Sequence, residues 1–411
     1  MHILFLTDNF TPEVNAPASR THEHCRLWVE AGHQVTVITC APNYPKGRVF
    51  AGYRNAWWQQ EQVDGIRVIR VWTYMSANEG FARRVLDHLS FTFAGALAGL
   101  FVRGVDIVIG TSPQFFTISA AWFVGAVKHR PFIFELRDLW PESIRAVGAM
   151  KDSLALRWLE RLEMFLYRRA ERIVSVTHSF RKVLRARGID AEKIDVVTNG
   201  VDIARFSPRP KDEALVRELG LQGKFVAGYV GTHGMAHALE TVLEAAGRVR
   251  DLADGDAYRF LMLGDGARKQ ALMEQARSQG LDNVIFVDLV SKQEVPRYWS
   301  LLDASVIHLR RTELFTTVIP SKLFECMGMG IPVLHGVAGE SAEIVVREGV
   351  GLVFEPENAQ ALVESLQRLR KEPRLADECR SRGLVAARNY DRRTLALLML
   401  QSLERAVASF R

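Results

Sequence analysis

Cationic and acidic side chains gather in one short stretch of the chain, Leu309–Leu334, which reads LRRTELFTTVIPSKLFECMGMGIPVL. Arg310 and Arg311 close an apolar strand, and a helix opens further on with Lys322. The residues between them include the hydroxyl side chains of Thr316, Thr317 and Ser321. A helix N-terminus flanked by arginine and lysine is a natural seat for a diphosphate. Glu325 lies on the same helix face as Lys322 but cannot bind an anion, so we expect it to hold a pair of sugar hydroxyls.

Two glycine turns follow apolar runs in the same half of the chain. Gly231-Thr232-His233-Gly234 ends one strand just before a helix, and its amides can hold a phosphate, with His237 as a further candidate. Gly264-Asp265-Gly266 ends the next strand, where glycine permits the close approach of a flat base. The alternative for each motif alone is an ordinary strand-to-helix turn.

The first half of the chain carries two further candidate segments. The loop after the first strand contains Asn15 and Ala16, small enough for a ligand to approach the backbone, and Arg20 lies one turn into the following helix. Arg137 and Asp138 end a buried strand, and Asp138 could act as a base or position an acceptor hydroxyl. The alternative is a structural ion pair of Arg137.

Other reaction chemistries find little support in the sequence. His22-Glu23-His24-Cys25 resembles a metal site, but residues two apart on a helix point to different faces. No Asp-x-Asp motif follows a strand, and no Gly-x-Ser-x-Gly nucleophile motif occurs. We therefore expect no metal and no resident cofactor, with the arginines and the lysine neutralising the diphosphate.

Alternating strand and helix patterns must position these residues. Apolar runs in the first half cover Ile3–Thr7, Gln34–Thr39, Ile66–Val71, Val105–Gly110, Phe132–Leu136, Ile173–Thr177 and Ile194–Thr198. Those in the second half cover Phe225–Gly231, Arg259–Gly264, Val284–Val287, Ala304–Leu309, Ile331–His335 and Gly351–Phe354. Short, nearly continuous apolar strands that alternate with helices predict an α/β fold with parallel sheets covered on both faces.

The length of 411 residues predicts two domains. We place an N-terminal, acceptor-binding, Rossmann-like domain at residues 1–205 and a C-terminal, nucleotide-sugar-binding, Rossmann-like domain at residues 206–385. Residues 386–411 are expected to form a C-terminal helix that packs back on the first domain. Ligands bind at the carboxyl ends of parallel strands, so two doubly wound domains should face each other across a ligand cleft.

Composition narrows the class of partner. The formal net charge is +6, but the basic residues are spread along the chain without zinc-finger spacing, so nucleic acid is not expected. The four cysteines, Cys25, Cys40, Cys326 and Cys379, lie far apart and predict reduced thiols in a cytosolic protein. The first ten residues, MHILFLTDNF, predict a buried strand, because they lack the basic flank and cleavage site of a signal peptide.

One uncharged segment, Leu89–Val102, complicates a purely cytoplasmic location. It reads LSFTFAGALAGLFV and is flanked by Arg83, Arg84 and Arg103. It is shorter than the roughly 20 residues that span a bilayer. It predicts either a buried helix of the first domain or a helix at the inner face of the cytoplasmic membrane, with arginines on lipid phosphates.

Taken together, the motifs resemble glycosyltransferase family 4, the retaining class with the GT-B fold. The resemblance covers nearly the whole chain. Its second half is carried by Gly231 with Leu239-Glu240-Thr241, by Gly264-Asp265-Gly266, and by Glu325 with Cys326-Met327-Gly328 and Gly330-Ile331-Pro332-Val333. Asn199-Gly200-Val201-Asp202 resembles the interdomain segment. The resemblance implies a nucleotide-sugar donor, with UDP as the expected nucleotide, and a leaving phosphate that takes the acceptor's proton.

The similarity is greatest to bacterial cell-surface polysaccharide transferases that move N-acetylated sugars, including the L-fucosamine type. Pro12-Glu13, Pro42–Gly47, Arg137–Ser143 and Pro320-Ser321-Lys322 carry it. It implies transfer of a sugar such as L-FucNAc or GlcNAc to a saccharide or polyprenyl-diphosphate-linked acceptor in O-antigen or capsule biosynthesis.

The chain also departs from the family pattern. The family's first glutamate falls at Thr317, its glycine pair at Asn15-Ala16, and its diphosphate-binding arginine and lysine at Thr232 and His237. We infer that Arg310 or Arg311, together with Lys322, supplies the missing positive charge. Two other functions remain open at this point: a UDP-sugar epimerase with the same fold, and a non-catalytic nucleotide-sugar-binding membrane scaffold.

Overall fold

The computed structural model describes residues 1–44, 47–75, 81–112, 114–140 and 154–410. Pro45 and Lys46 of one predicted motif, and Pro141, Glu142 and Ser143 of another, lie outside these ranges. The chain forms two compact units, one of Met1–Thr198 with Arg392–Arg411 and the other of Asn199–Asp391. We call them unit 1 and unit 2.

Unit 1 is built on an eight-stranded sheet in the order β3-β4-β2-β1-β5-β6-β7-β8. Its strands are β1 (His2–Leu6), β2 (Gln34–Cys40), β3 (Trp58–Val63), β4 (Ile66–Val71), β5 (Ile107–Thr111), β6 (Phe132–Leu136), β7 (Arg172–Ser175) and β8 (Ile194–Val196). Its helices are α1 (Ala16–Glu30), α2 (Phe81–Phe101), α3 (Phe115–Lys128), α5 (Leu154–Arg169), α6 (His178–Ala186) and α15 (Arg392–Ser409), with a short 3-10 turn at Ala191–Lys193.

Helices cover both faces of this sheet. One core contains side chains of α2, α3, α5 and α6, and the opposite core contains side chains of α1 and α15. β1, β5 and β6 are buried along their whole length, as the apolar runs predict. The sequence did not predict β3, which pairs with β4 in antiparallel fashion at the sheet edge. Four consecutive polar residues, Gln59 to Gln62, hide the period-2 pattern of this edge strand, although every second side chain is exposed.

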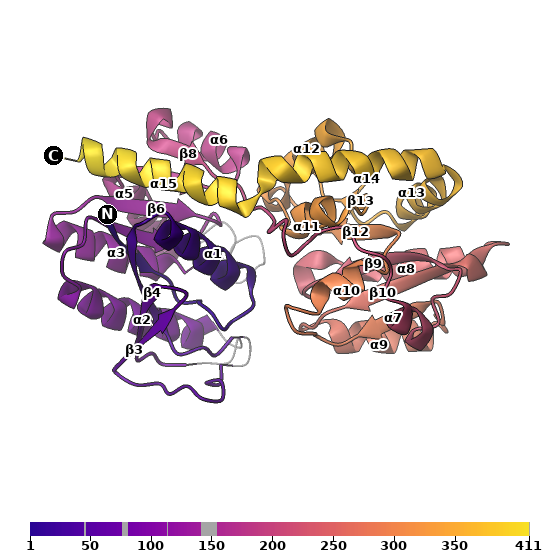
Figure 1. Cartoon of the computed structure of the whole chain (residues 1–411), viewed down its shortest axis with the longest axis horizontal. Coiled ribbons are helices and arrows are strands. Elements are labelled where there is room, and N and C mark those ends of the chain that lie inside the picture. The colour runs from indigo at the N-terminus through magenta and orange to yellow at the C-terminus, as the bar shows by residue number, and fades with distance from the viewer. Residues whose placement is uncertain (45–46, 76–80, 113, 141–153, 411) are drawn as a thin grey trace. The chain divides into compact units, whose positions relative to one another are not determined.

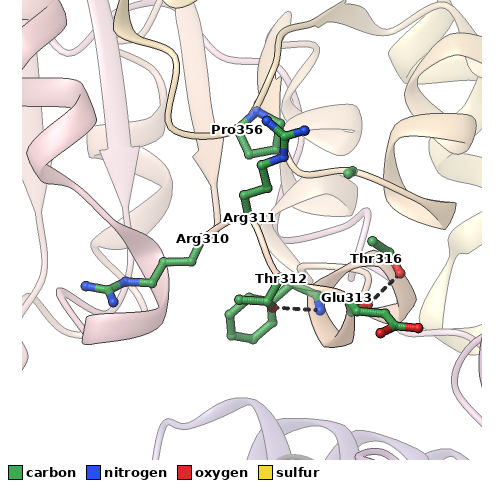
Figure 2. A pocket seen from close by; sticks show the side chains of 8 residues that line it. Arg310, Arg311, Thr312, Glu313, Thr316 and Pro356 are labelled. Carbon is green, nitrogen blue, oxygen red and sulfur yellow. Dashed lines mark hydrogen bonds between the residues drawn. The ribbon is translucent and has the colours of Figure 1, made fainter. Parts of the chain in front are cut away.

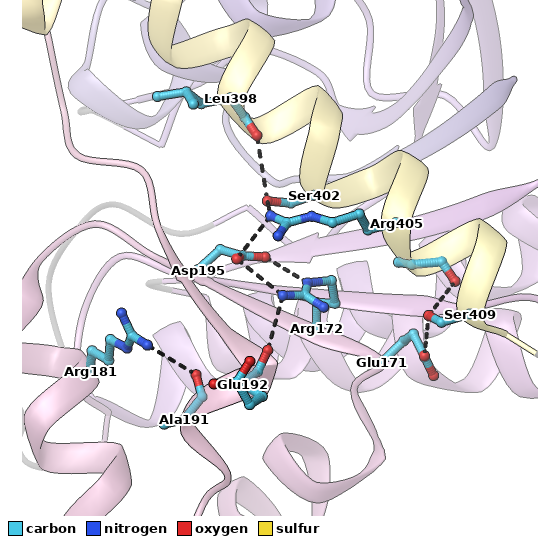
Figure 3. A network of polar contacts seen from close by, with 11 residues as sticks. Glu171, Arg172, Arg181, Ala191, Glu192, Asp195, Leu398, Ser402, Arg405 and Ser409 are labelled. Atoms are coloured by element: carbon cyan, nitrogen blue, oxygen red, sulfur yellow. Dashed lines mark hydrogen bonds and ion pairs between the residues drawn. The ribbon is translucent and has the colours of Figure 1, made fainter.

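The last helix, α15, belongs to unit 1, although unit 2 precedes it in the chain. The indole of Trp28 donates to the Ala396 carbonyl at 2.8 Å, and Met399 is fully buried beside α1. Polar contacts continue along the helix, as Figure 3 shows. Asp195 accepts from Arg172 at 2.6 Å and from Arg405 at 3.0 Å. The helix is therefore fastened to unit 1 by both core packing and ion pairs.

Unit 2 is built on a six-stranded parallel sheet in the order β11-β10-β9-β12-β13-β14. Its strands are β9 (Phe225–Val230), β10 (Tyr258–Leu263), β11 (Val284–Val287), β12 (Ala304–His308), β13 (Val333–Gly336) and β14 (Gly351–Val353). Its helices are α7 (Glu213–Glu218), α8 (Glu240–Arg250), α9 (Lys269–Ser278), α10 (Val295–Trp299), α11 (Lys322–Met329), α12 (Glu340–Glu348), α13 (Ala359–Lys371) and α14 (Pro373–Ala387). Short 3-10 turns lie at Met235–His237 (η2), Gly255–Ala257 (η3), Leu314–Thr317 (η4) and Arg388–Tyr390 (η5).

The sheet of unit 2 also has a core on each face. One core contains side chains of α10, α11, α12 and α14, and the other contains side chains of α8, α9 and α13. The predicted fold class, α/β with two doubly wound parallel-sheet units, is confirmed (Figure 1). The order of β9, β10 and β12 brings the two glycine turns and the Arg310–Lys322 segment to the same edge of this sheet, because parallel strands end together.

Candidate active site

The two glycine turns at the ends of β9 and β10 are joined by their backbones. The Gly231 amide donates to the Leu263 carbonyl at 2.9 Å, and the His233 amide donates to the Asp265 carbonyl at 2.9 Å. A side chain at Gly264, where φ is +140°, would place its Cβ 1.9 Å from the Gly231 carbonyl oxygen. Glycine is therefore required for turn-to-turn contact. Two of the amides that the sequence suggested for phosphate binding are already engaged, so other groups of the turn must bind an anion.

Lys322 brings a positive charge against the first of these turns. Its Nζ lies 3.6 Å from the ring centroid of Tyr229, and a Cβ at Gly231 would lie 2.9 Å from it. Nζ is shielded from solvent and has no hydrogen-bond partner among the described residues. Burial lowers the pKa of Lys322 to about 7, against smaller opposite effects of Cys326 and Glu325. An ammonium held in this way lacks an anionic partner.

Two histidines, one in this turn and one just after it, also have buried nitrogens without partners among the described residues. Both ring nitrogens of His233 and Nδ1 of His237 are buried and have no partner in the described part of the chain. Burial lowers the pKa of His233 to about 4 and that of His237 to about 3, and the charge of Lys322 adds to both effects. Both rings are therefore neutral near pH 7, and each carries one N–H donor. Buried donors without acceptors are rare in folded proteins, and together they suit a bound anion.

The remaining predicted residues of these turns have partners within unit 2. The Thr232 carbonyl accepts from the Tyr229 hydroxyl at 2.8 Å, which fixes the turn over the tyrosine ring. The Asp265 carboxylate accepts from the Gly266 amide at 2.8 Å and so stabilises the second turn. Lys269 donates to the Gly264 carbonyl at 2.9 Å and to Asp288 at 2.5 Å, so its charge is compensated.

The arginines at the end of β12 line a separate hollow of about 260 Å³. Its walls are formed by Arg310, Arg311, Thr312, Glu313, Phe315, Thr316, Ala338 and Pro356. The two arginine side chains extend in different directions (Figure 2). Arg311 pairs with Glu355 at 2.6 Å, and its amide donates to Glu357 at 2.7 Å. This placement argues against Arg311 as the missing diphosphate ligand, whereas the charge of Arg310 acts on Glu240 of α8.

The helix α11 presents the other predicted residues. Ser321 is its N-cap residue, and Glu325 lies in its first turn, half-buried, where its charge acts on Lys322 and Cys326. Ahead of the helix, the hydroxyls of Thr316 and Thr317 donate to the carbonyls of Glu313 and Leu314 within η4. Thr317 occupies the position of the family's first glutamate. Its hydroxyl proton is already donated to Leu314, so its oxygen can only accept a hydrogen bond from a ligand.

In unit 1 the predicted residues of the first loop and helix make structural contacts. The guanidinium of Arg20 is buried and donates to Glu135 at 2.9 Å and to the carbonyls of Val197 and Thr198 at 3.0 and 2.7 Å. These contacts argue against the predicted role of Arg20 in ligand binding. Asn15 caps α1 by accepting from the Ala18 amide at 2.9 Å, and Ala16 begins the helix.

Arg137 and Asp138 follow β6 as predicted. Burial lowers the pKa of Arg137 to about 10. The negative charge of Glu135 opposes this effect, which shows that the Glu135 carboxylate lies near the guanidinium. The guanidinium also donates to the Pro17 carbonyl at 3.3 Å. The Asp138 amide donates to the Ser112 hydroxyl at 3.1 Å, and its side chain is half-buried. Asp138 remains a candidate for orienting an acceptor.

Asp8, which was not predicted as a site residue, lies two residues after the end of β1. Burial raises the pKa of Asp8 to about 8, with further effects of Asp87 and Glu13. One of its oxygens accepts from Gln114, and the other is buried without a partner among the described residues. Glu13 accepts from the amides of Asn43 and Tyr44 at 2.8 and 2.9 Å. An acidic residue at the end of a buried parallel strand was the sequence signal.

Within the described ranges, no group of three or more His, Cys, Asp or Glu side chains is arranged to hold a metal ion. Over the same ranges, no helix combines the length and apolar composition that crossing a bilayer requires.

Two family models match the chain. The first, a glycosyl transferase 4-like domain, matches residues 15–200, and the second, of glycosyl transferases group 1, matches residues 224–372. WcaI of Escherichia coli (strain K12), whose name assigns it to colanic acid biosynthesis as a glycosyl transferase, is 25% identical over 96% of both chains.

Solved structures resemble the fold at low identity. Sucrose-phosphate synthase of Thermosynechococcus elongatus is similar with a TM-score of 0.78 at 16% identity, over 99% of both chains. HepE of Anabaena, solved in complex with UDP-glucose, is similar with a TM-score of 0.73 at 16% identity, over 98% of this chain and 100% of HepE.

Proposed function

Because the chain belongs to the family 4 glycosyltransferases with the GT-B fold, we propose that it transfers a sugar from a UDP-sugar to a saccharide acceptor with retention of configuration. The UDP complex of HepE supports the choice of nucleotide, and the name of WcaI supports a role in bacterial surface-polysaccharide biosynthesis. The Pro12-Glu13 and Pro320-Ser321-Lys322 segments favour an N-acetylated hexosamine such as L-FucNAc or GlcNAc. The reaction needs no metal in this proposal.

The observation that carries the proposal is the set of buried nitrogens at the end of β9. Lys322, His233 and His237 all lie against the ring of Tyr229, and their buried nitrogens have no acceptors in the described part of the chain. We assign them to the leaving diphosphate. Two unit charges 4 Å apart interact by about 4 kcal/mol at an effective dielectric near 20. If half of that is realised only as charge develops on the leaving group, the rate gain is roughly thirtyfold.

The other predicted residues have separate roles in the proposal. Glu325, one turn after Lys322, would accept hydrogen bonds from the ribose hydroxyls, and the Gly264–Gly266 turn would border the base. Asp138 of unit 1 would orient the acceptor hydroxyl. The leaving phosphate would accept the acceptor's proton, so the reaction requires no protein nucleophile.

The proposed acceptor is a saccharide, free or linked to a polyprenyl diphosphate. An acceptor of the second kind is held in a lipid bilayer by its hydrocarbon chain. The proposal therefore includes peripheral contact of unit 1 with the inner face of the cytoplasmic membrane, around the Leu89–Val102 segment of α2.

A ligand panel tests the donor. UDP should raise the melting temperature of unit 2 more than GDP or ADP at equal concentration, because a specific ligand stabilises the folded state by mass action. A larger effect of GDP or ADP would overturn the UDP assignment. Incubation with UDP-N-acetylglucosamine alone should yield no epimer. Formation of an epimer would show that the chain is an epimerase and would overturn the proposed transfer.

Substitutions in the same site test the assigned roles. Lys322→Ala should lower turnover by about thirtyfold or more without lowering the melting temperature, because the buried ammonium has no partner to lose. Glu325→Ala should weaken UDP binding by roughly 1–3 kcal/mol, the range for a hydrogen bond to a charged group. Lys371→Ala, at an exposed position of α13, is the matched control and should change neither quantity. Equal losses of folding and turnover in Lys322→Ala would reject the catalytic role.

A further inference from the structure

The outer face of α2 is apolar, which is unusual for a helix at the surface of a domain. Phe91, Ala98 and Val102 point into the core of unit 1. On the opposite side, Phe93 is 73% exposed and Phe101 is 68% exposed. Leu86 and Leu97 lie on the same outer side and are about half exposed. Surface helices normally place polar residues outward, and a helix that is apolar all round is typically covered by protein or lipid.

The neighbouring helix α3 extends this surface. Phe123 and Val127 of α3 are also exposed. The two helices are in close contact, because a Cβ at Gly99 would lie 2.8 Å from the Val124 side chain. We call the exposed set the α2–α3 face; it consists of Leu86, Phe93, Leu97, Phe101, Phe123 and Val127.

The α2–α3 face is held in place by a contact at its end. Nζ of Lys128, the last residue of α3, donates to the carbonyls of Leu100 and Val102 at 3.0 and 2.7 Å. These are carbonyls at the C-terminus of α2, which otherwise lack partners within the helix. The apolar surface is therefore a fixed feature of the unit and does not depend on a fluctuating helix end.

Aromatic side chains with polar groups border α2 on the strand side. Trp58 of β3 pairs with Val71 of β4, so its side chain lies on the sheet face that Val71 shares with Phe91 of α2. The Tyr74 amide donates to the Ser90 hydroxyl of α2 at 2.8 Å. Trp58 and Tyr74 are both exposed. Tryptophan and tyrosine are enriched where a protein meets the headgroup layer of a bilayer.

Three arginines lie near this surface, while the acidic residue of α2, Asp87, is half-buried and its charge acts on Asp8. Arg83 and Arg103 lie at the two ends of α2, Arg130 lies just beyond α3, and all three are exposed. None of the three has a carboxylate partner among the residues that the structure describes. Arginines around an apolar face complement the phosphates of anionic lipid headgroups.

We propose that the α2–α3 face is a membrane-docking surface that inserts its apolar side chains into an anionic bilayer, with Trp58, Tyr74 and the flanking arginines at headgroup level. The helix lies in the plane of the interface, because it is too short in apolar length to span. The proposal deepens the proposed function and rests on it for its purpose, since a polyprenyl-linked acceptor would reach the enzyme from that bilayer.

Vesicle co-sedimentation of the full chain tests the surface. The protein should bind vesicles of phosphatidylcholine with phosphatidylglycerol more tightly than vesicles of phosphatidylcholine alone. The double substitution Phe93→Asp with Leu97→Asp should weaken binding to the anionic vesicles at least tenfold. Arg83→Gln and Arg103→Gln should each weaken it by about fivefold, the effect of one basic residue near an anionic surface.

A matched control uses exposed apolar residues of unit 2. Val346→Asp with Val385→Asp places the same charges on α12 and α14 and should leave vesicle binding unchanged. The melting temperature and the response to UDP, measured for every variant, show that the variants are folded. These readouts are independent of vesicle binding, so loss of one proposal leaves the other standing.

Three results would overturn the membrane proposal. The first is no binding to either kind of vesicle, and the second is binding that Phe93→Asp with Leu97→Asp does not weaken. The third is a wild-type dimer that these substitutions convert to a monomer, without vesicle binding, which would assign the surface to a second copy of the chain.

Discussion

At the scale of single residues, two lysines of unit 2 show the difference between a structural charge and one that lacks a partner. Lys269 donates to two carbonyls, those of Gly264 and Val287, and to Asp288. Lys322 lies over the Tyr229 ring, with its Nζ buried and without an acceptor in the described ranges. Burying an unpaired ammonium destabilises a protein, so its presence is best explained by a ligand that completes it.

The pH dependence of donor binding follows from Lys322. Its pKa of about 7 in the free protein lies below the usual value, and a bound diphosphate should raise it. Binding then takes up a proton above about pH 7. The affinity should be at its maximum below that pH and should fall by up to about tenfold per pH unit as the pH rises beyond it. Calorimetry with UDP-N-acetylglucosamine in two buffers of different ionisation enthalpy measures both the affinity and the proton uptake.

Lys322→Arg provides the control for this titration. A guanidinium stays protonated throughout the range, so the affinity of this variant should not vary with pH, whatever its absolute value. An affinity of the wild type that stays constant between about pH 7 and pH 9, without proton uptake, would contradict the assignment of Lys322 to the diphosphate.

At the scale of elements, the site depends on two turns that touch through their backbones. β9 and β10 are paired in parallel register from Tyr258–Phe225 to Leu263–Val230, so their following turns meet at the same level. The closest approach is between Gly264 and the Gly231 carbonyl. This contact holds the first turn beside Lys322. The register of β9 and β10 therefore sets the geometry of the proposed anion site.

Gly264→Ala should therefore disturb unit 2 in two ways. The added Cβ would collide with the Gly231 carbonyl, and φ of +140° is unfavourable for alanine, so we expect a destabilisation of more than about 1 kcal/mol. UDP affinity should also fall, because the first turn must move. Chemical denaturation and UDP titration measure the two effects.

Gly220→Ala is the matched control for this substitution. Gly220 also has a positive φ, of +63°, but a Cβ there would meet no atom within 4 Å. Its substitution should cost about 1 kcal/mol or less and leave UDP affinity unchanged. The turn contact would be unnecessary if both variants bound UDP as well as the wild type does.

At the scale of the whole molecule, unit 1 is completed by residues from the far end of the chain. α15 buries Leu395, Met399 and Leu403 in the core that also contains Trp28 of α1. Unit 2 is formed by the continuous segment Asn199–Asp391. Each unit has its own cores, so their stabilities should be separable.

Met399→Ala should lower the stability of unit 1 by about 2–5 kcal/mol, the usual cost of truncating a buried methionine. The melting transition of unit 2 and its response to UDP should be unchanged. Leu366→Ala, at a fully buried position of α13, should do the reverse. Calorimetry of the full chain, with and without UDP, measures both transitions. A parallel shift of both transitions in both variants would show that the units unfold as one.

The sequence by itself determined the α/β alternation, the parallel sheets and the strand ends where the candidate residues lie. These features are encoded locally, in the spacing of apolar residues and in glycine and proline at turns. Edge strand β3 was not predicted, because its run of four polar residues resembles a loop, and only its pairing with β4 identifies it as a strand. The types of the site residues, a lysine and a glutamate on one helix face after a hydroxyl-rich loop, were also visible.

Only the tertiary structure decided which of these side chains lack partners. Arg20 finds Glu135 and two carbonyls, and Arg311 finds Glu355, whereas Lys322 meets the ring of Tyr229. The apolar segment alone allowed two interpretations, a buried helix or a helix at the membrane face. In the structure, one side of α2 is packed in the core and its outer side is exposed. The reason is that local periodicity sets which face of an element is buried, while hydrogen-bond partners come from elements far apart in the chain and are set by how those elements pack.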